Sequence, residues 1–177
     1  MVEFALILTP LLLSVLGTME VGYRIYALST TNGAIREAAR MASTGQYTGA
    51  QIDAKVTEMI KAFASSANVA IVKKSYSDYT GVNLPEPVTS GSRSSGKYCY
   101  QDINDNNQWD DDRGRDGLGG PEDVINYEVT VTYQTLFGFS QRTLGYGATS
   151  TIEQNTIVSN EPFAAVVDVE PKTLCVG

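Results

Sequence analysis

The chain begins with a long apolar run, and this run limits how the rest of the molecule can be arranged. From Phe4 to Met19, sixteen positions carry no charge, with Glu3 before the run and Glu20 directly after it. A helix of about 17 to 25 apolar residues crosses a bilayer. Because hydrophobic mismatch has a modest cost, the run predicts a short membrane-spanning helix whose ends reach the interface. A cleaved signal peptide is the alternative, but no basic segment precedes the run and no A-x-A-like cleavage site is present.

The helical pattern does not stop at Glu20. Apolar residues recur near the 3.6-residue period as far as Ala42, while three arginines and Glu37 take polar positions. One helix of about forty residues would be a rod of about 60 Å, twice the thickness of the hydrocarbon core. Half of the rod must therefore stand outside the membrane. Pro10 lies inside the apolar run and predicts a kink or a loosened turn.

The composition argues against two classes of function. The net charge is -7, with 20 acidic and 13 basic residues, so we expect no nucleic-acid partner. The chain has no histidine, which removes the usual activation of serine and cysteine nucleophiles. We therefore expect a protein that is not an enzyme. Acid and base carboxylates, as in glycoside hydrolysis, are the catalytic alternative, and no paired acids in a recognisable pocket support it.

After a break rich in Gly and Thr, the pattern predicts a second helix over about residues 50–66. Its apolar residues fall on one stripe, made of Ile52, Val56, Met59, Ile60 and Phe63. Pro, Gly and Ser then reach turn density in residues 79–97, which predicts an exposed loop.

Three segments are predicted to be strands. Residues 127–133 alternate apolar and polar side chains, which indicates a strand over 125–134 with one buried face. Residues 147–158 follow after a turn at 144–147 and could pair with it antiparallel. A strand at 69–76 would complete a small meander with one face covered by helices.

These segments together predict an α+β fold, in which a long N-terminal membrane-anchored helix and a second helix pack on a small antiparallel sheet. We assign residues 1–45 to the transmembrane and stalk helix. Residues 46–177 form the extracytoplasmic α+β domain, with an inserted acidic loop at 99–123. The last ten residues, 168–177, are either a final edge strand or a tail held by a cysteine.

Two cysteines, Cys99 and Cys175, lie 76 positions apart in the polar, loop-rich part of the chain. Oxidised pairs persist in exported proteins of this kind, so we predict one disulfide. Two separate thiols are the alternative. The absence of a CxxC spacing argues against a redox or metal role.

The acidic loop carries oxygen-bearing side chains at calcium-ligand spacing. Asp102, Asn104, Asn106 and Asp110 take the first, third, fifth and ninth positions of an EF-hand-like loop, and Gln108 could offer its backbone carbonyl at the seventh. The loop also resembles the DxNxNxxWD-type calcium loops of extracellular bacterial proteins. Six aspartates within fifteen residues would repel one another without a counter-ion.

Two positions depart from the EF-hand pattern. The sixth is Asn107 instead of glycine, although Asn tolerates the left-handed conformation. The twelfth is Arg113 instead of glutamate, so a nearby aspartate would have to replace it. The predicted calcium site therefore consists of Asp102, Asn104, Asn106, Gln108, Asp110 and Asp112. A solvated acidic loop whose Asn and Asp residues serve turns is the alternative.

A family resemblance is carried by two N-terminal stretches, VEFALILTPLLLSVLG and MEVGYRIYALSTTNGAIREAARMASTG, in which AIREAAR at 34–40 is the most specific part. The resemblance is to the TadE-like family of pseudopilins of the tight-adherence (Tad, or Flp) pilus system. It covers about the first 45 residues. The late stretch TIVSNEPF is also similar to a segment near the end of many members, whereas residues 66–123 have no counterpart.

The resemblance implies a role for Glu3. In pilin-like families, a glutamate near the mature N-terminus lies in the apolar core of bundled helices and meets the amino group of a neighbouring subunit, which sets the register of assembly. Without the resemblance, Glu3 is an acid at a helix N-terminus, where the helix dipole stabilises it by about 0.3 to 1 kcal/mol.

The resemblance also implies a pilin-like fold and a structural role. The protein would be a minor pilin or pseudopilin in the assembly of a Tad type IV pilus, with other pilin-like subunits and the Tad machinery as partners. It would cross the inner membrane once, with an extracytoplasmic C-terminal domain, and could enter the pilus. A membrane-tethered binding module stiffened by calcium is the alternative.

One feature of the family's precursors has no counterpart ahead of Glu3. Those precursors carry a basic leader that ends in glycine and is cut by a prepilin peptidase, whereas here no Lys or Arg precedes Glu3. Either the start of the natural chain differs from the one given, or this cleavage does not apply. The orientation is therefore inferred from the resemblance and from the exported character of the remainder.

Overall fold

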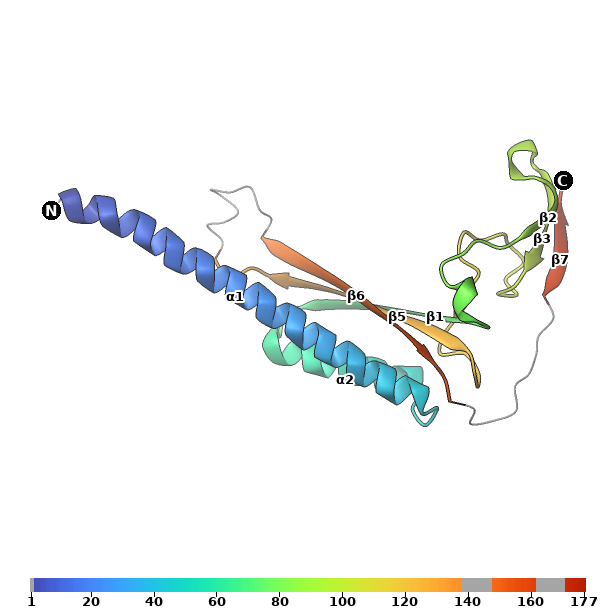
Figure 1. Ribbon diagram of the computed structural model, residues 1–177, viewed down its shortest axis with the longest axis horizontal. Helices are drawn as coiled ribbons and strands as arrows, with labels where there is room; N and C mark the ends of the chain where they lie inside the picture. The colour runs from blue at the N-terminus through green and yellow to red at the C-terminus, as the bar shows by residue number, and fades with distance from the viewer. Residues whose placement is uncertain (1, 138–147, 162–170) are drawn as a thin grey trace.

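The computed structural model describes residues 2–137, 148–161 and 171–177. Two helices are followed by strands that form two antiparallel sheets (Figure 1), which confirms the predicted α+β class. The helices and strands are α1 (Val2–Ser43), α2 (Gly49–Phe63), β1 (Asn68–Tyr76), β2 (Val88–Ser92), β3 (Lys97–Asp102), β4 (Arg115–Asp116), β5 (Val124–Gln134), β6 (Thr149–Ser159) and β7 (Lys172–Val176). Short 3-10 turns occupy Tyr79–Gly81 and Arg93–Ser95.

Helix α1 is a single rod of 42 residues, about 63 Å long at 1.5 Å per residue. It continues through Pro10, where the sequence predicts a kink or a loosened turn. A proline removes one hydrogen bond from the ladder, and the turns on either side still hold the helix together.

The two halves of α1 have different surroundings. The N-terminal half projects beyond the rest of the molecule (Figure 1), and its described side chains are mostly exposed. Among the described side chains of the helix, the first that is buried is Ala27, and Ala34, Ile35, Ala38 and Ala42 follow at helical spacing. The small alanines let the helix approach the sheet closely. The second half of α1 is therefore part of the domain core as well as a stalk.

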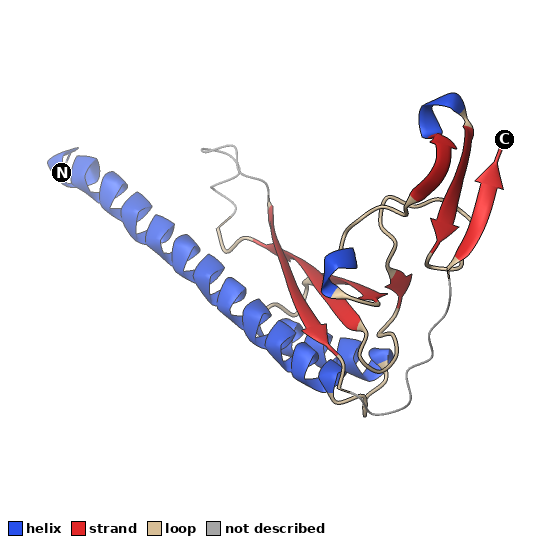
Figure 2. Cartoon of the chain, turned by 45° about the vertical axis from the view of Figure 1, so that its right-hand side comes forward, coloured by secondary structure: helices blue, strands red, loops and turns tan. Residues whose placement is uncertain are grey.

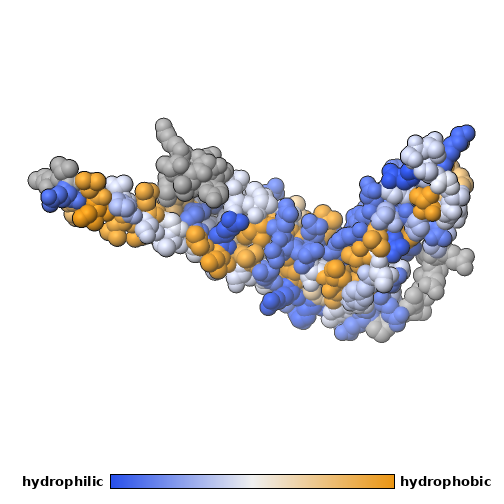
Figure 3. Space-filling view, turned by 45° about the horizontal axis from the view of Figure 1, so that its top comes forward, coloured by the Kyte–Doolittle hydropathy of each residue, from blue (hydrophilic) through white to orange (hydrophobic). Residues whose placement is uncertain are grey.

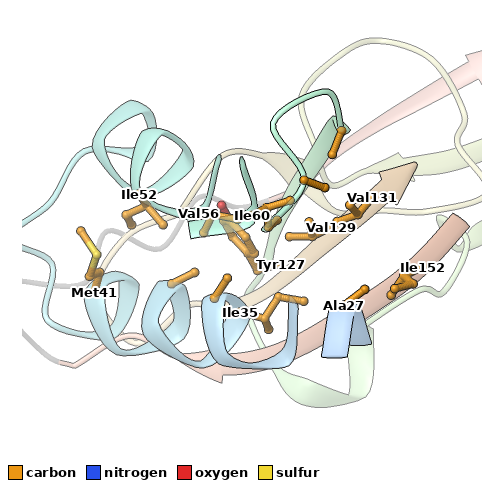
Figure 4. Close-up of a cluster of buried hydrophobic side chains, with 14 of the residues drawn as sticks. Ala27, Ile35, Met41, Ile52, Val56, Ile60, Tyr127, Val129, Val131 and Ile152 are labelled. Atoms are coloured by element: carbon orange, nitrogen blue, oxygen red, sulfur yellow. The ribbon is translucent and has the colours of Figure 1, made fainter. Parts of the chain in front are cut away.

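Helix α2 forms where the amphipathic stripe predicts it. Thr48 caps its first turn: the Thr48 hydroxyl accepts from the Gln51 backbone N–H, and the Gln51 side chain accepts from the Thr48 N–H. Ile52, Val56 and Ile60 are buried between α1 and the sheet, as Figure 4 shows. Met59 and Phe63 complete the stripe at its partly buried margin.

The larger sheet has the strand order β4-β1-β5-β6, and every pair is antiparallel. The predicted apolar face of β5 is confirmed, because Tyr127, Val129, Val131 and Tyr133 are all buried. Tyr127, Val129 and Val131 point toward α1 and α2, which cover this face of the sheet (Figure 4). Tyr133 packs edge-on against Tyr23 of α1 and Phe63 of α2. The predicted pairing of β5 with β6 is also confirmed, whereas the predicted turn at 144–147 lies outside the described residues.

A polar contact fastens α2 to this sheet. The Tyr127 hydroxyl donates to Asp53 Oδ1 at 2.9 Å, and the Lys73 ammonium pairs with the other oxygen of the same carboxylate. Burial, together with the carboxylate of Asp53, raises the pKa of the Tyr127 hydroxyl. The tyrosine therefore stays neutral and can donate this hydrogen bond at ordinary pH.

We expect Tyr127→Phe to lower the free energy of unfolding by about 1 to 3 kcal/mol, because it removes a hydrogen bond to a charged acceptor. Urea denaturation followed by circular dichroism measures the change. Tyr79→Phe is the control, since Tyr79 is exposed and its loss of a hydroxyl should leave the midpoint unchanged. Equal midpoints for Tyr127→Phe and the wild type would show that this contact does not fasten α2.

The smaller sheet, with strand order β2-β3-β7, lies at the end of the molecule away from the N-terminus (Figures 1 and 2). It corrects the prediction that 79–97 is only a loop, since β2 lies there. All five residues of β2 are exposed, so the polar composition that suggested a loop gives no apolar signal for a strand. Residues 99–102 of the predicted acidic loop belong to β3.

Strand β7 combines the two alternatives for the C-terminus. It pairs with β3 as an edge strand, and Cys175 lies directly opposite Cys99 in the register. The two cysteines form a disulfide, which confirms the prediction. The bond joins a C-terminal strand of five residues to the domain, where backbone pairing alone would be weak.

Candidate functional site

The first candidate site is the exposed apolar half of α1. Leu6, Ile7, Leu11 and Val15 are all exposed, and in the space-filling view hydrophobic residues occupy much of this free segment (Figure 3). Within the described residues, α1 is long and apolar enough to cross a membrane, and no residue in its most apolar stretch of 18 residues is buried. A soluble domain rarely leaves so much contiguous apolar surface in water, so this surface fits an anchor that lies in lipid or among other helices.

Glu3 lies in the first turn of this helix and is exposed. There the carboxylate faces the positive end of the helix dipole, which is favourable. If the segment enters an apolar environment, that carboxylate needs a cationic partner or a hydrogen-bond donor. The structure thus leaves Glu3 accessible to a group from outside its own chain.

The second candidate site is the acidic loop after β3. Asp102, at the end of β3, is buried, and its two oxygens accept from the backbone N–H groups of Asn106 and Asn107 at 3.1 and 2.8 Å. These bonds curl the loop around the carboxylate. Asn107 has the left-handed φ of 63°, a conformation that asparagine tolerates.

Three further predicted ligands converge on one point. Asn104 Nδ2 and Asn106 Nδ2 both donate to Asp110 Oδ2, at 2.8 and 2.5 Å. The oxygen and nitrogen of an Asn amide exchange places when the group rotates by a half turn. In that orientation the two amides would present oxygens beside Asp110. Gln108 is exposed, and its backbone N–H donates to Asn106 Oδ1 at 2.7 Å.

Asp112, the sixth predicted ligand, is engaged elsewhere. Its carboxylate pairs with Lys74 Nζ at 2.9 Å and accepts from the Tyr76 hydroxyl and the Gly114 N–H. Burial alone would raise its pKa, but these three donors outweigh burial and hold the pKa of Asp112 below its usual range. Burial and this carboxylate raise the pKa of Tyr76 to about 12.

The sign of the Asp112 shift fixes the acid behaviour of this contact. Because the folded-state pKa is depressed, the stabilisation is present above the unfolded-state pKa of about 4. It is lost as the pH falls through the lower folded-state value. The contact therefore joins the loop to β1 through the neutral pH range, and it separates Asp112 from Asn104 and Asn106, which donate to Asp110.

Sequence reasoning missed Glu86, the buried carboxylate that holds the acidic loop in place. Glu86 Oε1 accepts from the Ile103 N–H at 2.8 Å, and Oε2 accepts from the Asp110 N–H at 3.3 Å. The backbone of Glu86 also contacts the loop, since its carbonyl accepts from Trp109 Nε1 and its N–H donates to the Asp110 carbonyl. An acid between two prolines, Pro85 and Pro87, was the only signal in the sequence.

The donor chemistry of the loop suits a hard cation without completing a carboxylate cage. Carboxylates, amide oxygens and backbone carbonyls are the ligands that calcium prefers. Over the described ranges, the structure holds no cluster of three or more His, Cys, Asp or Glu residues that could bind a metal. A calcium ion here would therefore depend on the asparagine oxygens and on Asp102 and Asp110.

Comparison with known families decides the identity of the first candidate site. Residues 1–40 match the model of the TadE-like protein family. The match shows that the N-terminal segment of the chain is TadE-like. The matched residues cover the exposed apolar half of α1 and continue to Arg40.

The match at residues 1–40 confirms the resemblance seen in the N-terminal sequence and points to an association with the Tad pilus system. A single N-terminal apolar helix also fits a membrane anchor in such a protein. No curated protein and no solved structure matches the chain. The domain beyond residue 40 is therefore described from its own residues.

Proposed function

We propose that this TadE-like protein is a minor pilin or pseudopilin that acts in the assembly of a Tad pilus. The observation that carries the proposal is the coincidence of the TadE-like match with a helix whose N-terminal half has mostly exposed apolar side chains among those described. Such a helix can be stored in the inner membrane and can bundle with the helices of other subunits, because both surroundings are apolar. The other pilin-like subunits and the Tad machinery are the proposed partners.

The proposed role is structural and not catalytic. The extracytoplasmic domain, held by α2, the sheets and the disulfide, would stand outside the membrane on the second half of α1. The disulfide supports this placement, since oxidised pairs persist outside the cytoplasm.

Deletion of the gene followed by complementation tests the proposal. Loss of surface pili, with restoration by the wild-type gene, is the expected result, and electron microscopy of sheared pili measures it. A second arm deletes residues 46–177 and keeps the anchor, which should not restore pili if the domain takes part in assembly. Normal piliation in the deletion strain would overturn the proposal.

The proposal includes a calcium ion in the acidic loop. It is supported by the convergence of Asn104, Asn106 and Asp110, with the buried Asp102 beside them. The ion would bind their oxygens and reduce the repulsion among the aspartates, so it would stiffen the loop between β3 and β4. The site would stabilise the domain and not supply chemistry.

We expect EGTA to lower the melting temperature of the domain. At a free calcium concentration of 100 times the dissociation constant, binding contributes about 2.7 kcal/mol, which corresponds to roughly 5 to 10 °C for a chain of this size. Differential scanning calorimetry with and without calcium measures the shift. Asp110→Asn should remove the shift, and the control Asp111→Asn should keep it, since the Asp111 side chain is 92% exposed. An unchanged melting temperature of the wild type would support the alternative, a solvated acidic loop that binds no calcium.

A further inference from the structure

The segment that follows β5 contacts α1 at the point where the charge-free run ends. Glu20 is the first charged residue after the run, and its Oε2 accepts from the Phe137 backbone N–H at 3.2 Å. Phe137 lies three residues beyond the end of β5. The end of β5 is therefore fixed at the height of Glu20 along the helix.

The length of the run places this contact at the surface of the membrane. The charge-free run from Phe4 to Met19 is about 24 Å long, whereas the hydrocarbon core is about 30 Å thick. About four more residues are needed to cross it, which brings the crossing to Tyr23. Glu20 would then lie within the boundary of the apolar layer, where its hydrogen bond with Phe137 lowers the cost of burying a carboxylate.

Apolar exposure continues past Glu20 onto the domain. Val21, Ile25 and Tyr26 are 59%, 62% and 58% exposed, and Leu136, next to Phe137, is 47% exposed. Val21, Ile25 and Tyr26 extend the exposed apolar surface of α1 past the run, and Leu136 adds an exposed apolar side chain next to the contact between Phe137 and Glu20. We call Val21, Ile25, Tyr26 and Leu136 the foot of the domain.

An aromatic cluster and two basic residues accompany the foot. Tyr26 packs edge-on against Phe63 at the end of α2, and Tyr23 packs against both Phe63 and Tyr133, with ring centroids 5.6 to 6.4 Å apart. Aromatic rings gather at membrane interfaces, where an apolar body and a polar tip are both satisfied. Arg24 follows Tyr23, and Lys61 lies two positions before Phe63. Both are exposed, and long basic side chains of this kind can reach lipid phosphates.

We propose that the foot rests in the headgroup layer of the bilayer, so that the domain docks on the lipid surface instead of standing clear of it on a stalk. The inference depends on the proposed membrane anchoring of α1 and adds a second membrane contact to it. Lipid is the occupant because the run needs about four more residues to cross the hydrocarbon core, and the exposed apolar side chains of the foot lie at and just beyond the end of that crossing. The domain would have to lift its foot from the lipid when the subunit leaves the membrane.

Depth-dependent fluorescence quenching tests the proposal. Trp109 is the only tryptophan, so the wild type reports the acidic loop, and Trp109→Phe provides a background for single reporters. Val15→Trp reports the anchor, and Leu136→Trp and Tyr26→Trp report the foot. Each full-length variant is reconstituted in phosphatidylcholine and phosphatidylglycerol vesicles, with chains brominated near the glycerol backbone or near the chain centre.

We expect both foot reporters to show blue-shifted emission and loss of fluorescence with the bromines near the glycerol backbone. Val15→Trp should be quenched by the deeper bromines, and Trp109 should not be quenched. If Val15→Trp is quenched and both foot reporters are not, the foot proposal fails and the anchor stands. Blue-shifted foot reporters without quenching would show that protein covers the foot and would also overturn the proposal. Absence of quenching in every variant would contradict the anchor and the proposed function.

Discussion

Glu3→Gln should abolish pilus assembly while the protein still inserts in the membrane. Glutamine is neutral and nearly the same size, so the apolar run keeps its length and its membrane affinity. What the substitution removes is the charge that would pair with an amino group of a neighbouring subunit inside an apolar bundle. Because the pair would form only in one register, its loss should reduce surface pili to the level of the deletion strain.

Pilus counts by electron microscopy and membrane fractionation measure the two halves of this prediction. Glu153→Gln is the matched control, since it is the same substitution at an exposed position of β6. The control should restore normal piliation. If Glu3→Gln also restores it, Glu3 acts only as a helix cap and sets no register.

Glu86→Ala should cause the largest loss of stability of any single substitution in the acidic loop and the smaller sheet. The Glu86 carboxylate is buried and accepts from two backbone N–H groups, those of Ile103 and Asp110. Alanine leaves both donors unpaired, at a cost of about 1 to 3 kcal/mol each. We therefore expect the free energy of unfolding to fall by about 2 to 6 kcal/mol.

Urea denaturation in the presence of EGTA measures this loss without any contribution from calcium. Glu86→Gln keeps one acceptor oxygen and should have an intermediate effect, whereas the exposed Asp111→Ala should change the stability by less than about 0.5 kcal/mol. A loss below about 1 kcal/mol for Glu86→Ala would show that water replaces the carboxylate easily. The loop would then owe its shape to its own asparagines.

The parts of the fold that periodicity controls could be predicted from the sequence. The stripe from Ile52 to Phe63 indicated α2, and the alternation from Tyr127 to Tyr133 indicated β5, because in each case one face must be buried. The long apolar helix followed from its length and lack of charge. The disulfide followed from the number of cysteines and their setting.

The parts that long-range polar contacts control could not be predicted. Strand β2 has five exposed residues and no apolar face, so its pairing with β3 depends on backbone hydrogen bonds that composition does not show. The Glu86 carboxylate accepts from the backbone N–H of Asp110, which lies 24 positions later in the sequence. The contacts of Asp112 with Lys74 and Tyr76 could likewise not be predicted, because these partners lie on a strand far away in sequence.

The most direct test is whether the first twenty residues stay part of the protein in the cell and hold it in the membrane. Membranes are washed with alkaline carbonate, and the mass of the intact protein in the pellet and in the medium is measured by mass spectrometry. We expect that the protein resists extraction and that the pelleted form contains the apolar run from Phe4 to Met19. A protein released by carbonate, or one found outside the cell with this run removed, would contradict this expectation.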